Sequence, residues 1–98
     1  MSSDSNIVIK KLLQKISNQL IKKSEYDNFI DCDVFFVFGS KHKTAMCDFV
    51  YGLKIKSKSQ LRDNYLISKL QSDIKSNMDN LFDVSVCCTD VIFEKKDN

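Results

Sequence analysis

Few side chains in this 98-residue chain could carry out chemistry, and the first to consider is its single histidine, His42. It lies in a basic segment between Lys41 and Lys43, five residues before Cys47. A cysteine nucleophile needs a base within hydrogen-bond reach and a further group that orients the base. Nothing in the sequence places such a third group near this pair. We therefore predict no catalytic residue here.

The cysteines favour structural thiols over a metal site. The chain has no Cys-x-x-Cys spacing, and two of its four cysteines are adjacent in sequence. Adjacent strand residues point to opposite faces, so they seldom bind one ion together. The N-terminal residues show neither the basic nor the apolar region of a secretory leader. We predict no metal, no cofactor, a cytoplasmic location (the host cytosol if the source is viral), and four reduced thiols: Cys32, Cys47, Cys87 and Cys88.

The carboxylates do not complete a catalytic pattern either. The turn at residues 38–40 and the later Asp48 resemble the nucleotidyltransferase pattern, in which a Gly-Ser turn precedes a strand with two carboxylates that hold Mg²⁺. Here apolar residues follow Asp48, so the second carboxylate is missing. A metal-dependent nuclease would need an acid two residues before Lys54 or Lys56, and the chain has none there. We predict that the protein is not an enzyme.

Two amphipathic helices are predicted from apolar residues at spacings of three and four. The first spans about residues 6–24. The second follows Ser57, which can cap it while Gln60 reaches back, and runs to about Asn80. Their apolar stripes are Ile9, Leu12, Leu13, Ile16, Leu20 and Ile21 in the first, and Leu61, Tyr65, Leu66, Leu70, Ile74, Met78 and Leu81 in the second.

Three strands are predicted. A polar loop at 25–33 precedes five β-forming residues at 34–38, which predict a strand buried on both faces. Residues 44–56 alternate with period two after a short turn, so the pair should form an antiparallel hairpin. The third strand covers 82–89, and its alternation changes phase near Asp90, which predicts a bulge or an edge position.

The order helix–strand–strand–helix–strand predicts one α+β domain of residues 1–98, with frayed ends at 1–5 and 94–98. Two helices should cover one face of a three-stranded mixed sheet. This order resembles type II KH modules and the ring-building domains of secretion and sporulation machines. KH modules clamp nucleic acid with a Gly-x-x-Gly loop. The comparable stretch at 39–42 lacks the second glycine, so no binding residue carries over.

One face of the sheet should remain apolar and uncovered. In the strand at 44–56, the set from Ala45 to Ile55 that includes Phe49 and Tyr51 should face the helices. A monomer seldom leaves a large apolar patch in water. We predict a non-catalytic assembly module that self-associates or binds a protein partner; one helix on each face is the competing arrangement. The predicted interface residues on the uncovered face are Met46, Val50, Phe36, Val91 and Phe93.

The charge distribution supports an alternative function. The net charge is only +2, but basic residues gather in the first helix and in the hairpin. An RNA- or DNA-binding protein could use them on phosphates. Fourteen lysines accompany one arginine, with no proline or tryptophan, which indicates an AT-rich genome such as that of a virus, phage, parasite or low-GC bacterium. No apolar run suits a membrane. The candidate nucleic-acid residues are Lys41, His42, Lys43, Lys54, Lys56 and Lys58.

Overall fold

The computed structural model describes residues 3–37 and 47–96. The predicted order of helices and strands is confirmed, with one added turn of 3-10 helix. The chain is an α+β domain in which two helices pack on a three-stranded mixed sheet. The elements are α1 (Ser3–Leu20), η1 (Ser24–Tyr26), β1 (Phe29–Phe36), β2 (Phe49–Ser57), α2 (Asn64–Phe82) and β3 (Val86–Lys95).

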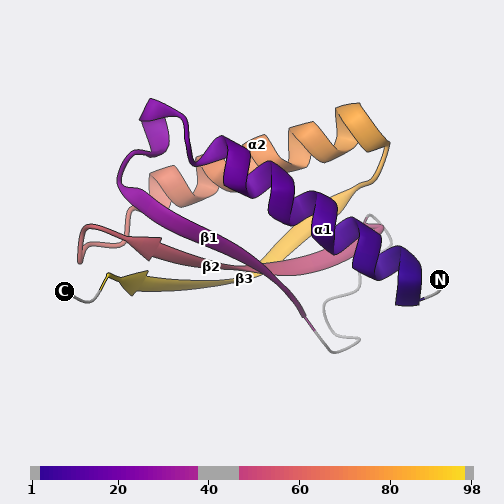
Figure 1. The fold of residues 1–98 in the computed structure, drawn as a ribbon, viewed down its shortest axis with the longest axis horizontal. Coiled ribbons are helices and arrows are strands. Elements are labelled where there is room, and N and C mark those ends of the chain that lie inside the picture. Colours follow the sequence, from indigo (N-terminus) through magenta and orange to yellow (C-terminus); the bar gives the residue numbers. More distant parts are fainter. Residues whose placement is uncertain (1–2, 38–46, 97–98) are drawn as a thin grey trace.

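The sheet has the order β1-β2-β3. β1 runs antiparallel to β2, and β2 runs parallel to β3, so the sheet is mixed as predicted. α1 and α2 lie side by side on the same face of this sheet (Figure 1). The two-layer arrangement is therefore confirmed for the described elements, and the competing arrangement with one helix on each face is wrong.

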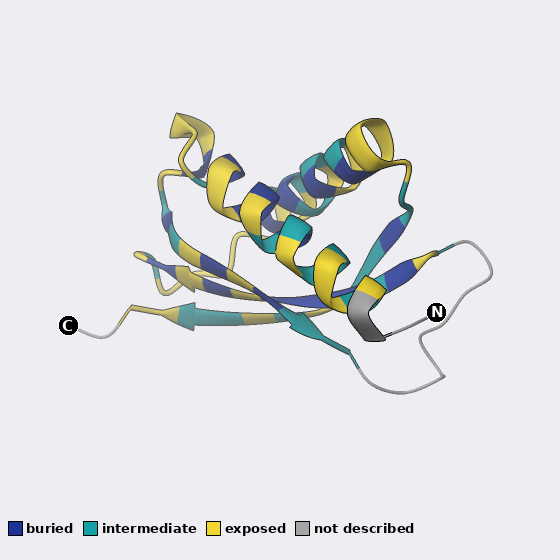
Figure 2. Cartoon of the chain, turned by 45° about the vertical axis from the view of Figure 1, so that its right-hand side comes forward, coloured by how far each residue is buried: buried dark blue, intermediate teal, exposed yellow. Residues whose placement is uncertain are grey.

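The core lies between the helices and the sheet. On β2 the alternation is as predicted, because Phe49, Tyr51, Leu53 and Ile55 are buried while the lysines between them are exposed. The inner surfaces of both helices are buried against these residues (Figure 2). Each large apolar side chain buried in this way contributes about 1.5–3 kcal/mol to stability. The helices contribute Leu13, Ile16 and Leu20 from α1, and Ile67, Leu70, Ile74 and Met78 from α2.

β1 is longer and less buried than predicted. It begins at Phe29, inside the segment that was expected to be a loop. Cys32 and Val34 are buried under the helices, whereas Asp31 and Asp33 between them are exposed. The acids therefore occupy the solvent side of an edge strand, and the strand is not buried on both faces. Its predicted end, residue 38, lies outside the described residues.

α2 begins six residues later than predicted, at Asn64 with Asp63 as its cap. Ser57 is the last residue of β2 and is buried, and its hydroxyl donates to the carbonyl of Asn28 at 3.2 Å. Asp63 takes the capping role instead, since its Oδ1 accepts the backbone N–H of Leu66 at 2.9 Å. Two capping patterns compete locally, and the burial of Ser57 in the sheet selects the second.

β3 contains the predicted irregularity. Tyr51 pairs with Cys88 and Gly52 pairs with Asp90, so Thr89 is the extra residue of a β-bulge. The bulge restores the apolar residues that follow it to the helix-covered face. β3 begins at Val86 and not at residue 82, which is still helical. It also continues through residues 94 and 95, which were expected to belong to a frayed tail.

α1 is joined to β1 by one side chain. The Nε2 of Gln14 donates to the carbonyl of Cys32 at 2.7 Å, and its Oε1 accepts the N–H of Val34 at 2.8 Å. A side-chain amide carries the same donor and acceptor as a peptide group. Gln14 therefore occupies the middle of the edge of β1 that faces away from β2, where an exposed strand could otherwise pair with another chain.

η1 is joined to α2 by a buried tyrosine. Tyr26 is fully buried, and its hydroxyl donates to Oδ2 of Asp73 at 2.5 Å. Beside it, Lys69 forms an ion pair with Glu25 at 2.9 Å. Burial, followed by the hydrogen bond with Asp73, raises the pKa of Tyr26 well above that of an ordinary tyrosine. The connection between α1 and β1 is thus held against the second helix.

Candidate functional site

The outer face of the sheet, which is turned away from both helices, is the surface on which the predicted interface would lie. No element that the structure describes covers it (Figure 1). Because strand residues alternate, its members follow from the pairing of the strands. They are Asp31, Asp33 and Phe35 on β1, Val50, Gly52, Lys54 and Lys56 on β2, and Cys87, Asp90, Ile92 and Glu94 on β3.

A phenylalanine lies over a glycine at the centre of this face. Phe35 is opposite Gly52 in the central strand, and a Cβ added to Gly52 would overlap the ring of Phe35. Glycine inside a strand costs about 0.5–1 kcal/mol relative to alanine, and here its missing side chain makes room for the ring. Val50 lies beside them on β2, and Ile92 on β3 is 47% exposed. We name Phe35, Val50 and Ile92 the outer-face patch.

Gly52→Ala should lower the free energy of unfolding by about 1–2 kcal/mol, because the new methyl group displaces the Phe35 ring. In a Phe35→Ala background the same change should be neutral or stabilising, since the obstacle is gone and alanine is the better strand residue. Urea denaturation of the four proteins measures the coupling between the two positions. If the losses of unfolding free energy in the two single variants simply add in the double variant, the contact between Phe35 and Gly52 is contradicted.

Three of the five predicted interface residues lie on the other face. Phe36 pairs with Tyr51 on the helix-covered side. There its ring packs edge to face against that of Phe49, with the two ring centroids 5.9 Å apart. The bulge places Val91 and Phe93 against the core as well. Their placement on the uncovered face was therefore wrong. Phe36 belongs to the alternating set of β1 that includes the buried Val34 and faces the helices. For Val91 and Phe93, a bulge was predicted near Asp90, but the change of face that it produces was not applied to the residues after it.

The other two predicted interface residues are Val50 and Met46. Val50 is on the outer face and half-buried. Met46 lies outside the described residues. Phe35 and Ile92 were missed, although a signal for Phe35 exists: it has the same parity as the exposed Asp31 and Asp33. Two acids at alternate positions mark the solvent side of a strand, and the alternation then assigns Phe35 to that side.

The predicted basic surface is flanked by acids. Lys54 forms an ion pair with Glu94 at 3.5 Å and lies opposite Asp33. Lys56 lies opposite Asp31 on one side and Glu94 on the other. Acids on both neighbouring strands reduce the positive potential that a phosphate would meet. Lys58, just after β2, is exposed, and Lys41, His42 and Lys43 lie outside the described residues.

The thiols differ from the prediction in one pair. Cys32 is buried and free, and its burial raises its pKa to about 12. Cys88 is half-buried and free, and burial again raises its pKa. Cys47 and Cys87, however, form a disulfide with their Cα atoms 6.1 Å apart, so the prediction of four free thiols is wrong for this pair. Cys47 lies two residues before β2 and Cys87 is the second residue of β3, so the neighbouring starts of these two strands bring them together across 40 residues of sequence.

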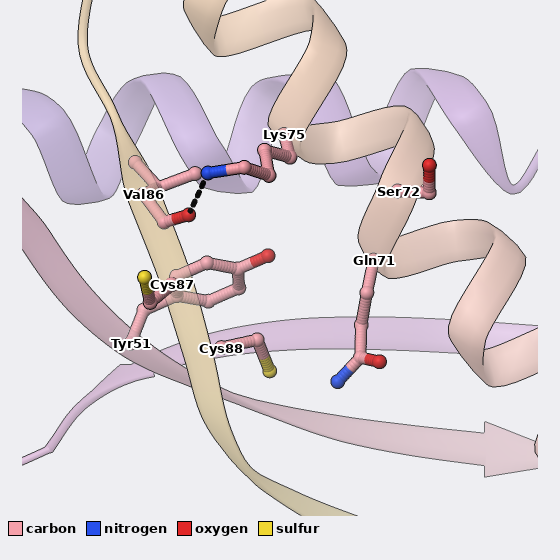
Figure 3. Close-up of a pocket in the computed structure, with 7 residues that line it drawn as sticks. All are labelled: Tyr51, Gln71, Ser72, Lys75, Val86, Cys87 and Cys88. Carbon is pink, nitrogen blue, oxygen red and sulfur yellow. Dashed lines mark hydrogen bonds between the residues drawn. The ribbon is translucent and has the colours of Figure 1, made fainter. Parts of the chain in front are cut away.

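A pocket of about 340 Å³ opens between α2 and β3, a feature that the sequence did not predict. We name it the α2–β3 pocket (Figure 3). No acidic side chain lines it. Elsewhere in residues 3–37 and 47–96, no three side chains of His, Cys, Asp or Glu come together as metal ligands. The residues lining the pocket are Tyr51, Gln71, Ser72, Lys75, Val86, Cys87 and Cys88.

Neither helix, within the described part of the chain, is both long and apolar enough to cross a membrane. A scan against protein-family models, a search of curated proteins and a search of solved structures each found no match to the chain.

Proposed function

We propose that this chain is a small non-catalytic interaction module that self-associates through the outer-face patch. The observation that carries the proposal is the Phe35 ring lying over Gly52 at the centre of a sheet face that no described element covers. The central strand β2 has a glycine at this position, and the absence of a side chain leaves room for the ring. The result is an aromatic surface flanked by Val50 and Ile92, and aromatic residues are enriched at the centres of protein interfaces.

The face is a better candidate than the edge of the sheet. An edge strand recruits partners through unpaired backbone groups. On β1 the groups at the middle of the edge already bond Gln14, through the carbonyl of Cys32 and the N–H of Val34. A partner strand would have to displace that side chain first. The outer face requires no such displacement among the described residues.

The charges on the outer face suit a second copy of the chain. β1 carries two exposed acids there, Asp31 and Asp33, and β2 carries two exposed lysines, Lys54 and Lys56. A copy related by a two-fold axis can set its β1 acids over the β2 lysines of the first copy, and the reverse holds by symmetry. The apolar patch would then be buried beside these charge pairs, while Asp90 and Glu94 on β3 add two further acids, so the charges of the face are only partly complementary.

Val50→Lys tests this proposal. The new ammonium group would have to be buried at the interface, so the dissociation constant of the dimer should rise at least about tenfold while the fold persists. Size-exclusion chromatography with light scattering measures the mass, and circular dichroism reports the fold. Val8→Lys is the matched control, because Val8 is 55% exposed on α1 and far from the patch in sequence and fold. This variant should change neither the mass measured by light scattering nor the circular dichroism spectrum.

Two results would contradict self-association. A wild-type protein that stays monomeric at millimolar concentration would exclude it, and so would a Val50→Lys variant that loses its fold, since the outer face would then be interior. Adding single-stranded and duplex RNA and DNA at low salt tests the nucleic-acid alternative. Binding that weakens steeply with salt would favour that alternative over a protein partner.

We also propose that the module acts in the cytoplasm. The free thiols of Cys32 and Cys88 support a reducing compartment. The disulfide between Cys47 and Cys87 argues in the other direction, and in the cytoplasm this bond would be reduced.

A further inference from the structure

The floor of the α2–β3 pocket is formed by the hydroxyl end of Tyr51, which Figure 3 shows directed from β2 toward α2. Only 1% of this residue is exposed. Within residues 3–37 and 47–96, no residue forms a hydrogen bond with the hydroxyl. Like any tyrosine, Tyr51 keeps its proton at neutral pH and can donate, and burial raises its pKa further. No fully buried side-chain nitrogen or oxygen of the described residues lacks a hydrogen-bond partner, so the oxygen of this hydroxyl reaches the open space of the pocket, where it can donate to a ligand.

Lys75 supplies the positive charge at the rim. Its Nζ donates to the carbonyl of Val86 at 3.2 Å and lies 3.5 Å from the hydroxyl oxygen of Ser85. No carboxylate of the described residues forms an ion pair with it. The Gln71 amide projects into the same space from one turn earlier on α2, beside the sulfur of Cys88 (Figure 3). The polar side chains around the pocket therefore present donors and one uncompensated cation.

Apart from the hydroxyl of Ser72, the rest of the lining is mostly apolar. The ring of Tyr51, the side chain of Val86 and the stem of Lys75 form most of the wall. A volume of about 340 Å³ lies near the lower limit for small-molecule pockets. A single ammonium group matches a singly charged ligand better than a phosphate dianion. From this geometry we infer that the pocket binds a small monocarboxylate with a short apolar body, its oxygens held by Lys75 and Tyr51.

Hexanoate is a suitable probe, because it joins one carboxylate to a short alkyl chain. Titrated into the 15N-labelled full chain, it should produce saturable amide shifts in α2 and in the first half of β3. A ligand of this size is expected to bind with a dissociation constant on the order of 1 mM. 1-Hexanol and hexylamine, which lack the negative charge, should bind at least about tenfold more weakly.

Variants separate the two proposed contacts. Lys75→Met keeps the stem and removes the charge, and should weaken hexanoate binding about tenfold. Tyr51→Phe keeps the ring and removes one donor, and should weaken binding about fivefold. Lys11→Met is the matched control, since Lys11 is exposed on α1, which contributes no residue to the pocket lining, and the change should leave binding unchanged.

Gln71→Glu gives a second and independent test on a half-buried helix position, where the fold should tolerate the change. It adds a negative charge at the rim, so hexanoate binding should be lost. The inference is overturned if hexanoate at tens of millimolar causes no saturable shift. It is also overturned if the alcohol and the amine bind equally well, or if both Lys75→Met and Gln71→Glu bind hexanoate as the wild type does.

Discussion

The protein should lose stability steeply above about pH 10 and unfold between about pH 11 and 13. Three buried groups hold their protons in the native state: the hydroxyls of Tyr26 and Tyr51 and the thiol of Cys32. Burial raises the pKa of each, to about 12 for Cys32 and further above the ordinary tyrosine value for the other two. In the unfolded chain the same groups ionise near pH 8.5 for cysteine and about 10 for tyrosine.

The direction in which the free energy of unfolding changes with pH follows from proton linkage. Between the unfolded and the native pKa of each group, the unfolded state binds fewer protons, so the free energy of unfolding falls by about 1.4 kcal/mol per pH unit. The stability that each group preserves is complete below its unfolded pKa and is lost as the pH rises toward its native pKa. Above about pH 10 all three act together, at about 4 kcal/mol per unit, so two units remove about 8 kcal/mol, which is comparable with the 5–15 kcal/mol typical of a domain.

Circular dichroism during an alkaline titration measures this transition. Tyr51→Phe and Cys32→Val each remove one titrating group and should make the decline with pH about one third less steep. Tyr65→Phe, at a position that is 79% exposed, is the matched control and should leave the profile as it is in the wild type. Profiles that coincide for all four proteins would show that buried tyrosine and thiol ionisation does not cause the unfolding.

Leu53→Ala should lower the free energy of unfolding by about 2–5 kcal/mol. Leu53 is completely buried in the central strand, between Val34 on β1 and Val91 on β3. Removing its side chain leaves a cavity that three strands and two helices would have to close together. The loss is a large part of the stability of a small domain. Urea denaturation followed by circular dichroism gives the difference directly.

Leu61→Ala provides the matched comparison. Leu61 precedes α2 and is 81% exposed, so the same chemical change should alter stability by no more than about 0.5 kcal/mol. Because both variants lose the same atoms, the difference between them reports burial alone. Equal effects at the two positions would contradict the burial of Leu53 between the sheet and the helices.

The parts of the fold that the sequence predicted are those governed by local periodicity. The alternation of β2 named its buried residues one by one, and the phase change near Asp90 predicted the bulge. The start of α2 was missed because both Ser57 and Asp63 match a capping pattern. What decides between them is the contact of Ser57 with Asn28, 29 residues earlier in the chain, which no local pattern contains.

The candidate surfaces were harder to predict for the same reason. The side of the sheet on which Phe36, Val91 and Phe93 lie depends on strand register and on one bulged residue, and an error of one position reverses the face. The disulfide joins residues 40 positions apart. The α2–β3 pocket combines β2, α2 and β3, so it exists only once all three have packed.

The two hydrogen bonds of Gln14 also bear on how many copies could join. Strand addition at an edge is open-ended, because the β3 edge of each copy would be left to receive the β1 edge of the next, and fibres grow in this way. With the middle of the β1 edge occupied, that route is obstructed. Face-to-face pairing instead consumes the surface that each copy offers, so growth would end at two. A single helical amide would thus favour a finite complex over a fibre.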